Sequence, residues 1–192
     1  MDILFENFKE DVIQRAYKID ACPIAIAKIE QAKTYAEITD AIKSRFFLLV
    51  EKEIIKPADF KTYGAYLCAN GIYLNQNVLN GYVFVTGERK IAARGKSIVV
   101  AMDKSEVDAY NNTFVIARNE STIRGYNNVK IRAKDFVGIL AYDNVTVNAC
   151  GNASIVAKDN SVITAFGDVL IKKEKDVRIF ASDSVKVEDM NE

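Results

Sequence analysis

The chain has 192 residues, of which 49% are hydrophobic, and its 26 basic and 26 acidic side chains give a formal net charge of zero. This length suffices for one sizeable domain, or for a small domain joined to a repeat array. The balanced charge argues against specific nucleic-acid binding, because such proteins depend on Lys and Arg contacts to phosphates.

The residue types that most often carry catalysis or hold metals are scarce. The chain has no histidine, which removes the commonest general base and the commonest metal ligand. Its three cysteines, Cys22, Cys68 and Cys150, lie far apart and form neither a zinc-binding spacing nor a disulfide framework. We expect them to be small core residues in a reducing compartment, and we predict no cofactor, metal site or catalytic residue.

The first residues, MDILFENFKEDV, carry acids where a secretory signal needs Lys or Arg before an apolar run. No apolar stretch approaches the roughly 18 residues of a membrane-spanning helix. We therefore expect no export by a signal peptide, no membrane insertion and a cytoplasmic location.

Residues 1–62 have the pattern of a helical capping domain. Pro23 suits the first turn of a second helix, which we expect to run through Lys33. Thr34 begins a capping box with Glu37, and the apolar pattern from Arg45 stops at Pro57. The first helix is predicted from apolar residues at helical spacing: Ile3, Leu4, Phe8, Val12 and Ala16.

Residues 63–80 are rich in Gly, Asn and Tyr, and they mark a change of period. We interpret this segment as a linker or a first irregular coil.

Residues 81–188 form an octapeptide repeat in which every eighth residue is Val or Ile. Two residues later stands a small residue in most units, usually Ala, and Val85 and Lys173 depart from this rule. The central positions are Val83, Ile91, Val99, Val107, Val115, Ile123, Ile131, Ile139, Val147, Ile155, Ile163, Ile171, Ile179 and Val187.

Each octad reads as a strand followed by a corner. The Val/Ile and the small residue are two apart, which is the period of a β-strand, so both point to one face. The intervening triplets are rich in Gly, Asn and Asp, which tolerate positive φ and favour turns. A unit this short buries its inward face only by stacking on its neighbours. The repeat therefore predicts a single-stranded parallel β-solenoid.

The phrase Tyr-Asn-Asn recurs sixteen residues apart, which indicates two octads per coil and about seven coils. With this pitch Tyr110, Tyr126 and Tyr142 stack at one corner, a device known from in-register parallel strands. A second column there would hold Asn112, Asn128, Asn144 and Asn160, whereas the other corner shows no comparable columns.

The outward positions of the first three coils are apolar on one side. We expect residues 1–62 to cover this patch and to cap the first coil, since an exposed strand edge invites aggregation. The patch consists of Tyr82, Phe84, Ile98, Val100, Phe114 and Ile116.

The stretch AYDNVTVNACGNASIVAKDNSVITAFGD, from Ala141 to Asp168, resembles octapeptide arrays with units such as AYGNATVT in uncharacterised proteins of bacteria, phages and mobile elements. The resemblance covers Gly81 to Val187 well and the helical leader weakly. It implies a solenoid and a phage or mobile-element origin, with a virion-associated location in the phage case, and it brings no catalytic residue. Lys173 departs from these units because a charge replaces an inward methyl group, which predicts irregular stacking in the last coils.

One charged cluster resembles the outward carboxylates of solenoid enzymes. Glu106 and Asp108 lie two apart on one strand, with Arg124 one coil later, and such a pair suits a metal or an acid pair. We interpret the cluster as cross-strand charge pairs on a solvated face. We predict no enzyme activity, because short corners build no wall for a substrate cleft.

These observations predict a non-enzymatic structural or interaction protein whose rigid solenoid faces a protein partner or another copy of itself. A phage structural component and an inhibitor of a host factor both belong to this class. The alternative is a carbohydrate-binding or adhesin module that uses the tyrosine corner. The candidate contact residues are Tyr110, Tyr126, Tyr142, Leu170, Phe180, Lys130 and Arg132.

Overall fold

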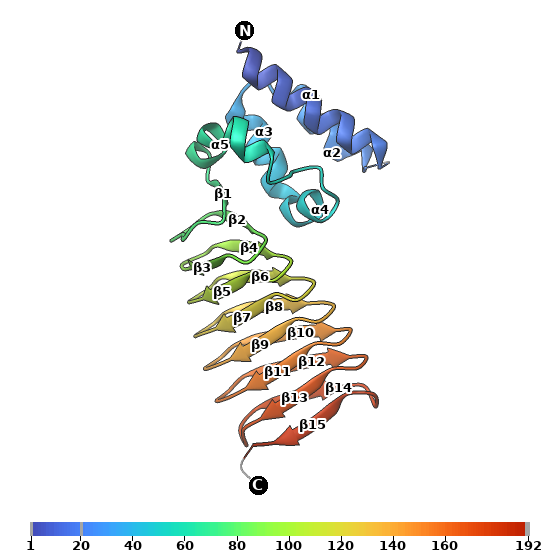
Figure 1. The fold of residues 1–192 in the computed structure, drawn as a ribbon, viewed down its shortest axis with the longest axis vertical. Helices are drawn as coiled ribbons and strands as arrows, with labels where there is room; N and C mark the ends of the chain where they lie inside the picture. The colour runs from blue at the N-terminus through green and yellow to red at the C-terminus, as the bar shows by residue number, and fades with distance from the viewer. Residues whose placement is uncertain (1, 20, 191–192) are drawn as a thin grey trace. The chain divides into compact units, whose positions relative to one another are not determined.

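The computed structural model describes residues 2–19 and 21–190. The chain divides into two compact units, Met1–Leu74 and Asn75–Glu192. The first unit is helical and the second is a parallel β-solenoid, as the periods of the two segments predict (Figure 1).

The helical unit extends further along the chain than the sequence pattern indicates. The predicted linker is partly wrong, because its first residues belong to α5, and the second helix ends at Gln31 rather than Lys33. The elements are α1 (Ile3–Lys18), α2 (Pro23–Gln31), α3 (Tyr35–Ser44), α4 (Phe46–Glu51), α5 (Asp59–Ala69) and a short strand, β1 (Ile72–Leu74).

Local capping explains where α2 and α3 begin. Pro23 is at the start of α2, and the Thr34 hydroxyl accepts a hydrogen bond from the Glu37 amide (3.2 Å) at the start of α3.

The Asp59 carboxylate holds α1 and α5 together, because both of its oxygens accept hydrogen bonds from the Arg15 guanidinium (2.8 and 2.9 Å). It also accepts the Lys56 amide (2.8 Å), so this buried charge is fully engaged.

The solenoid consists of two parallel sheets that face each other across one core. Sheet A contains β2 (Tyr82–Val85), β4 (Ile98–Ala101), β6 (Phe114–Ala117), β8 (Lys130–Ala133), β10 (Thr146–Cys150), β12 (Val162–Phe166) and β14 (Arg178–Ala181). Sheet B contains β3 (Lys90–Ala93), β5 (Glu106–Ala109), β7 (Thr122–Gly125), β9 (Gly138–Ala141), β11 (Ser154–Ala157), β13 (Leu170–Lys173) and β15 (Lys186–Asp189).

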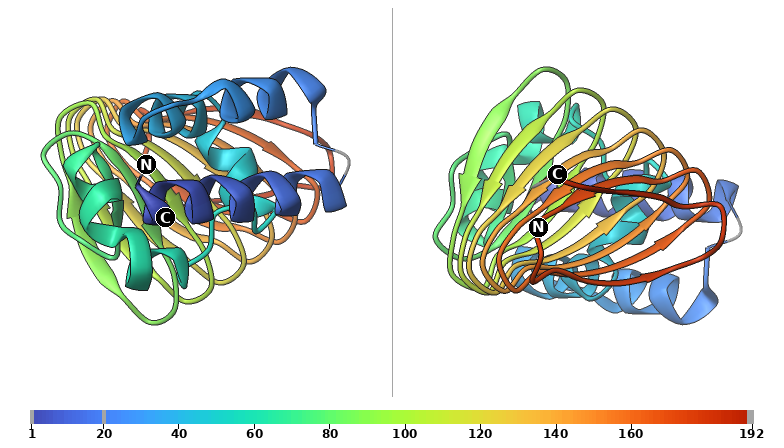
Figure 2. Two further views of the ribbon diagram at one scale, coloured as in Figure 1. Left: turned by 90° about the horizontal axis from the view of Figure 1, so that it is seen from above. Right: turned by 90° about the horizontal axis from the view of Figure 1, so that it is seen from below.

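The register between neighbouring strands confirms the coil of two octads. Val147 pairs with Ile131 on one side and with Ile163 on the other, each sixteen residues away. The same offset holds in sheet B, where Ile155 pairs with Ile139 and Ile171. The structure therefore has about seven coils of about 16 residues. Viewed along the solenoid, each coil is turned slightly relative to the one before (Figure 2), as the twist of parallel strands requires.

The inward row is buried as the repeat predicts, from Val83 through Ile171. Some units place a hydroxyl at the first inward position. There, Ser97, Thr113 and Ser121 each donate a hydrogen bond to the carbonyl three residues earlier, at 2.6–2.9 Å, which closes the corner. These three hydroxyls are therefore buried with a hydrogen bond formed, whereas those of Ser105 and Ser161 at equivalent positions are buried without a partner.

Both corners carry a ladder of Asx side chains, beside the predicted Asn column at the tyrosine corner and contrary to the prediction at the other corner. At the tyrosine corner, one position before the predicted Asn column, φ is positive at Gly95 and at Asn111, Asn127, Asp143 and Asp159. At the other corner, where no column was predicted, they are Asp103, Asn119 and Asp135, followed by Gly151 and Gly167. The Asp143 carboxylate accepts the Asn127 amide of the preceding coil (2.8 Å), and the Asp159 carboxylate accepts the Asp143 amide (2.9 Å). Each ladder thus fixes its corner and ties successive coils together.

Asparagine side chains occupy the edge of the first coil. The side-chain oxygens of Asn75, Asn77 and Asn80 accept the amides of Thr86, Ala92 and Lys96, at 2.7–2.9 Å. These three backbone amides are therefore not free to donate hydrogen bonds to a further strand added at this edge. These side chains thus satisfy three backbone donors at the start of the solenoid unit.

Lys173 does not disturb the stacking, contrary to the prediction from its charge. β13 and β15 pair in register, with Lys173 opposite Asp189, and the two side chains form an ion pair at 2.7 Å. Exposure instead increases toward the last strands, where Ile179 is half-buried and Val187 is 44% exposed. β14 and β15 are the last strands of their sheets, so each has a neighbour on one side only and its inward side chains are left uncovered on the other.

The outward apolar patch of sheet A lies where the sequence places it. Phe84, Val100 and Ile116 are buried, whereas Tyr82, Ile98 and Phe114 are half-buried. Its coverage by residues 1–62 remains a prediction.

We predict that Ile139→Ala lowers the free energy of unfolding by about 2–4 kcal/mol, because it leaves a cavity in the middle of the stack. The matched control is Val187→Ala at the equivalent position of the last coil, where the cost should stay below about 0.5–1 kcal/mol. Urea denaturation followed by circular dichroism measures both values. Equal losses would contradict this assignment of the core.

Candidate functional site

The three candidate tyrosines form one continuous stack. The rings of Tyr110 and Tyr126 lie 5.0 Å apart at 11°, and those of Tyr126 and Tyr142 lie 5.0 Å apart at 3°. The Arg94 guanidinium lies over Tyr110, 5.0 Å from its centroid, and Lys158 stands one coil after Tyr142 with an ion pair to Glu174 (3.0 Å). The predicted tyrosine column is therefore confirmed, and cationic residues stand at both of its ends.

In this stack, the tyrosine rings cover the faces on which a sugar ring or a nucleobase would stack. Tyr126 is covered on one face by Tyr110 and on the other by Tyr142. Burial raises the pKa of Tyr126, and the neighbouring Tyr142 and Tyr110 raise it further. The corner therefore presents ring edges and hydroxyls to solvent, which is the arrangement of a structural ladder.

The charged cluster of sheet B is neutralised within the sheet. One guanidinium nitrogen of Arg124 donates to Glu106 (3.0 Å) and to Asp108 (3.2 Å), and Lys90 approaches both carboxylates at 3.8 and 3.5 Å. The hydrogen bond to Glu106 is the largest of the effects that raise the pKa of Arg124. The predicted cross-strand charge pairs are present, and these carboxylates are engaged with cations rather than directed at an open cleft.

The remaining candidate residues lie on different faces. Lys130 and Arg132 are exposed on the outward face of β8, and the Arg132 guanidinium lies over the Phe114 ring at 5.4 Å. Phe180 is 62% exposed on β14 of the same sheet, whereas Leu170 is half-buried on β13 of sheet B. The structure thus does not bring Leu170 and Phe180 together.

Two exposed phenylalanines were not among the predicted contact residues. Phe136 is 64% exposed in the corner after β8, and Phe166 is 58% exposed at the end of β12, at the same corner two coils later. Phe166 lies on the strand that pairs with β14, which carries Phe180. Aromatic residues at corner positions, where Asn, Asp and Gly are usual, are the signal that identifies them.

The cysteine side chains do not behave as core residues. Cys22 is exposed, and Cys68 and Cys150 are partly accessible, so the expectation of three buried cysteines is wrong.

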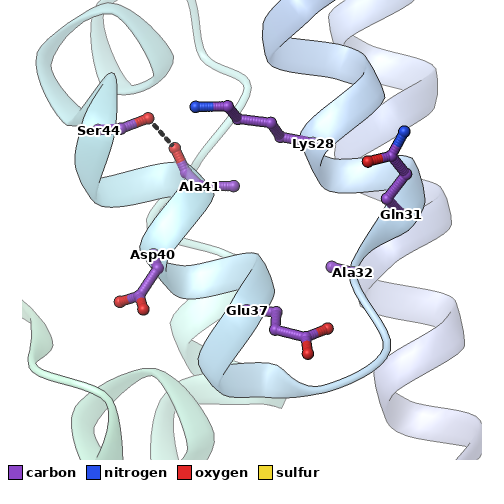
Figure 3. A pocket seen from close by; sticks show the side chains of 7 residues that line it. All are labelled: Lys28, Gln31, Ala32, Glu37, Asp40, Ala41 and Ser44. Atoms are coloured by element: carbon purple, nitrogen blue, oxygen red, sulfur yellow. Dashed lines mark hydrogen bonds between the residues drawn. The ribbon is translucent and has the colours of Figure 1, made fainter.

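The helical unit has a cavity of about 400 Å³ between α2 and α3 (Figure 3). Its two carboxylates already have partners, because Glu37 accepts the Lys33 amide (2.6 Å) and Asp40 pairs with Lys43 (3.1 Å). The side chains around it therefore stabilise the start and the surface of α3. The lining residues are Lys28, Gln31, Ala32, Glu37, Asp40, Ala41 and Ser44.

Among residues 2–19 and 21–190, no group of three or more Cys, Asp or Glu side chains is arranged to hold a metal ion. The helices within the same residues are too short or too polar to span a bilayer.

Comparison of the chain with protein-family models, with curated proteins and with solved structures finds no match.

We predict that Tyr126→Ala costs about 1–3 kcal/mol of stability, because it removes two ring contacts at once. Tyr126→Phe keeps the stack and should cost less than about 0.5 kcal/mol. Thermal unfolding of both variants checks the comparison. A loss from Tyr126→Phe as large as that from Tyr126→Ala would assign the role to the hydroxyl instead of the ring.

Proposed function

We propose that this chain is a non-enzymatic interaction protein, in which the rigid solenoid presents one edge of sheet A to a protein partner or to a second copy. The observation that carries the proposal is the exposure of Phe136, Phe166 and Phe180, at 64%, 58% and 62%. Large apolar side chains gathered at an exposed surface are typical of protein contact sites, and aromatic side chains contribute strongly to binding.

The solenoid holds these residues at fixed spacings. Phe166 and Phe180 lie on strands joined in register, and their backbones are tied into a continuous sheet. Binding through such a surface costs little conformational entropy, because only side chains need to be ordered. A phage or mobile-element role, as a structural component or as an inhibitor of a host factor, belongs to the same class and forms part of this proposal.

The alternative is a carbohydrate-binding module at the tyrosine corner. The regular spacing of 5.0 Å between rings favours it, since a polymer with a repeating unit could follow such an array. The covered ring faces weigh against it, because sugar rings stack on aromatic faces. We therefore rank it second.

The test combines affinity capture with a measurement of molecular mass. Wild-type protein and the Phe166→Asp/Phe180→Asp variant are used as baits in a lysate of the source organism, and light scattering measures self-association. The matched control is Ile24→Asp/Leu79→Asp, which introduces the same charges at apolar residues that are 71% and 68% exposed.

The proposal expects one protein partner, or the dimer signal, to be lost from the phenylalanine variant and retained by the control. Unchanged capture and mass in the phenylalanine variant would contradict the proposed edge. Selective binding on a glycan array that Tyr126→Ala abolishes would support the carbohydrate alternative instead.

A further inference from the structure

The second half of sheet A has an outward face that contains cations and no acid. From β8 to β14, one column of paired residues runs Lys130, Thr146, Val162, Arg178, and its neighbour runs Arg132, Asn148, Thr164, Phe180. Lys130, Arg132 and Arg178 are exposed. Between them lie two strands whose outward side chains are uncharged.

In sheet B, by contrast, oppositely charged side chains on neighbouring strands form ion pairs. There Arg124 and Lys90 approach Glu106 and Asp108, and Lys172 pairs with Glu188 (3.5 Å). In sheet A, no ion pair joins Lys130 or Arg178 to a carboxylate among the described residues, and Arg132 contacts a ring. The same fold thus pairs Lys90, Arg124 and Lys172 of sheet B with acids and leaves Lys130, Arg132 and Arg178 of sheet A without acidic partners among the described residues.

The geometry of this face suits an extended or flat ligand. Lys130 and Arg178 lie three strand spacings apart, which is about 14 Å. Thr146, Asn148 and Thr164 offer hydrogen-bond donors and acceptors across the space between them. The face also continues into the edge that carries Phe166 and Phe180.

We propose that this cationic face, with Lys130, Arg132 and Arg178, binds an acidic segment of a protein partner, whose apolar side chains contact Phe166 and Phe180. The inference rests on the proposed function and specifies the chemistry of the partner. Carboxylates at two sites about 14 Å apart would complement the cations at the two ends of the face.

An acidic protein fits this face better than the other polyanions do. Nucleic-acid affinity grows with the number of phosphate contacts, and three cations spread over four strands provide few. An acidic polysaccharide would meet the same charges, but it has no apolar side chains to cover Val162 and the exposed Phe180. The exposed phenylalanines therefore favour a polypeptide.

The experiment measures fluorescence polarisation of a labelled 20-residue peptide of glutamate with leucine at every fourth position. The full chain is compared with a face variant, Lys130→Glu/Arg132→Glu/Arg178→Glu. The matched control variant, Lys104→Glu/Lys175→Glu/Lys186→Glu, makes the same change in net charge at exposed lysines in the two corners and on sheet B. Polygalacturonate and single-stranded DNA serve as competitors, and circular dichroism verifies the fold.

We expect the face variant to weaken peptide binding by roughly tenfold or more and the control to change it less than about threefold. Equal loss in both variants would overturn the proposal, since it would show attraction by net charge alone. Preferential displacement by polygalacturonate or by DNA would also overturn it and assign the face to that polymer. A partner captured through Phe166 and Phe180 that binds the face variant normally would refute this inference while leaving the proposed function intact.

Discussion

The parallel, in-register stacking of one coil on the next is the constraint on which the structure depends. Each strand donates and accepts hydrogen bonds with the strands sixteen residues before and after it, so a side chain always lies over its equivalent in the next coil. A residue type that is favourable at one position of a coil is therefore favourable at the same position of every coil along the solenoid axis. Val and Ile build a continuous core, Asx residues build ladders at the corners, and tyrosines build a stack.

The sequence predicts the coil because its strongest signals are those that stacking repeats. The Val/Ile row identifies the strands, and the tyrosines at positions 110, 126 and 142 distinguish a coil of two octads from one of three. The ladder of the tyrosine corner was not distinguished from the Asn column beside it, because Asn111 and Asn112 are the same residue type and only φ tells them apart. At the other corner, the residue type changes from coil to coil while the backbone conformation stays the same: φ is positive at Asp103, Asn119 and Gly151.

Other errors arose where tertiary contacts override local pattern. α5 contains Gly64 and two tyrosines, which favour a linker by composition, yet Tyr63 and Leu67 are buried in the helical unit. Lys173 looks incompatible with an inward row, but Asp189 lies opposite it in the next coil and neutralises its charge. The exposed Phe136 and Phe166 were overlooked because neither is repeated sixteen residues away, as the corner tyrosines are.

The net charge of zero conceals an unequal distribution between the two sheets. In sheet B, Lys90, Arg124 and Lys172 pair with acids of adjacent strands, whereas the second half of sheet A keeps three cations beside exposed aromatic residues. Because the strands are held in one hydrogen-bonded sheet, the three cations keep fixed separations, as a binding surface requires. The proposed contact face follows from this asymmetry rather than from a pocket.

The sixteen-residue pitch, on which the stacking depends, is tested directly by chemical cross-linking. With Cys22, Cys68 and Cys150 replaced by serine, Thr146→Cys/Val162→Cys places two thiols on adjacent strands, in register. Thr146→Cys/Leu170→Cys places them on opposite sheets, twenty-four residues apart. Dibromobimane becomes fluorescent when it bridges two nearby thiols, so the sixteen-residue pitch predicts strong fluorescence from the first pair and none from the second. Bridging of the second pair without the first would show a coil of three octads and would contradict the structure described.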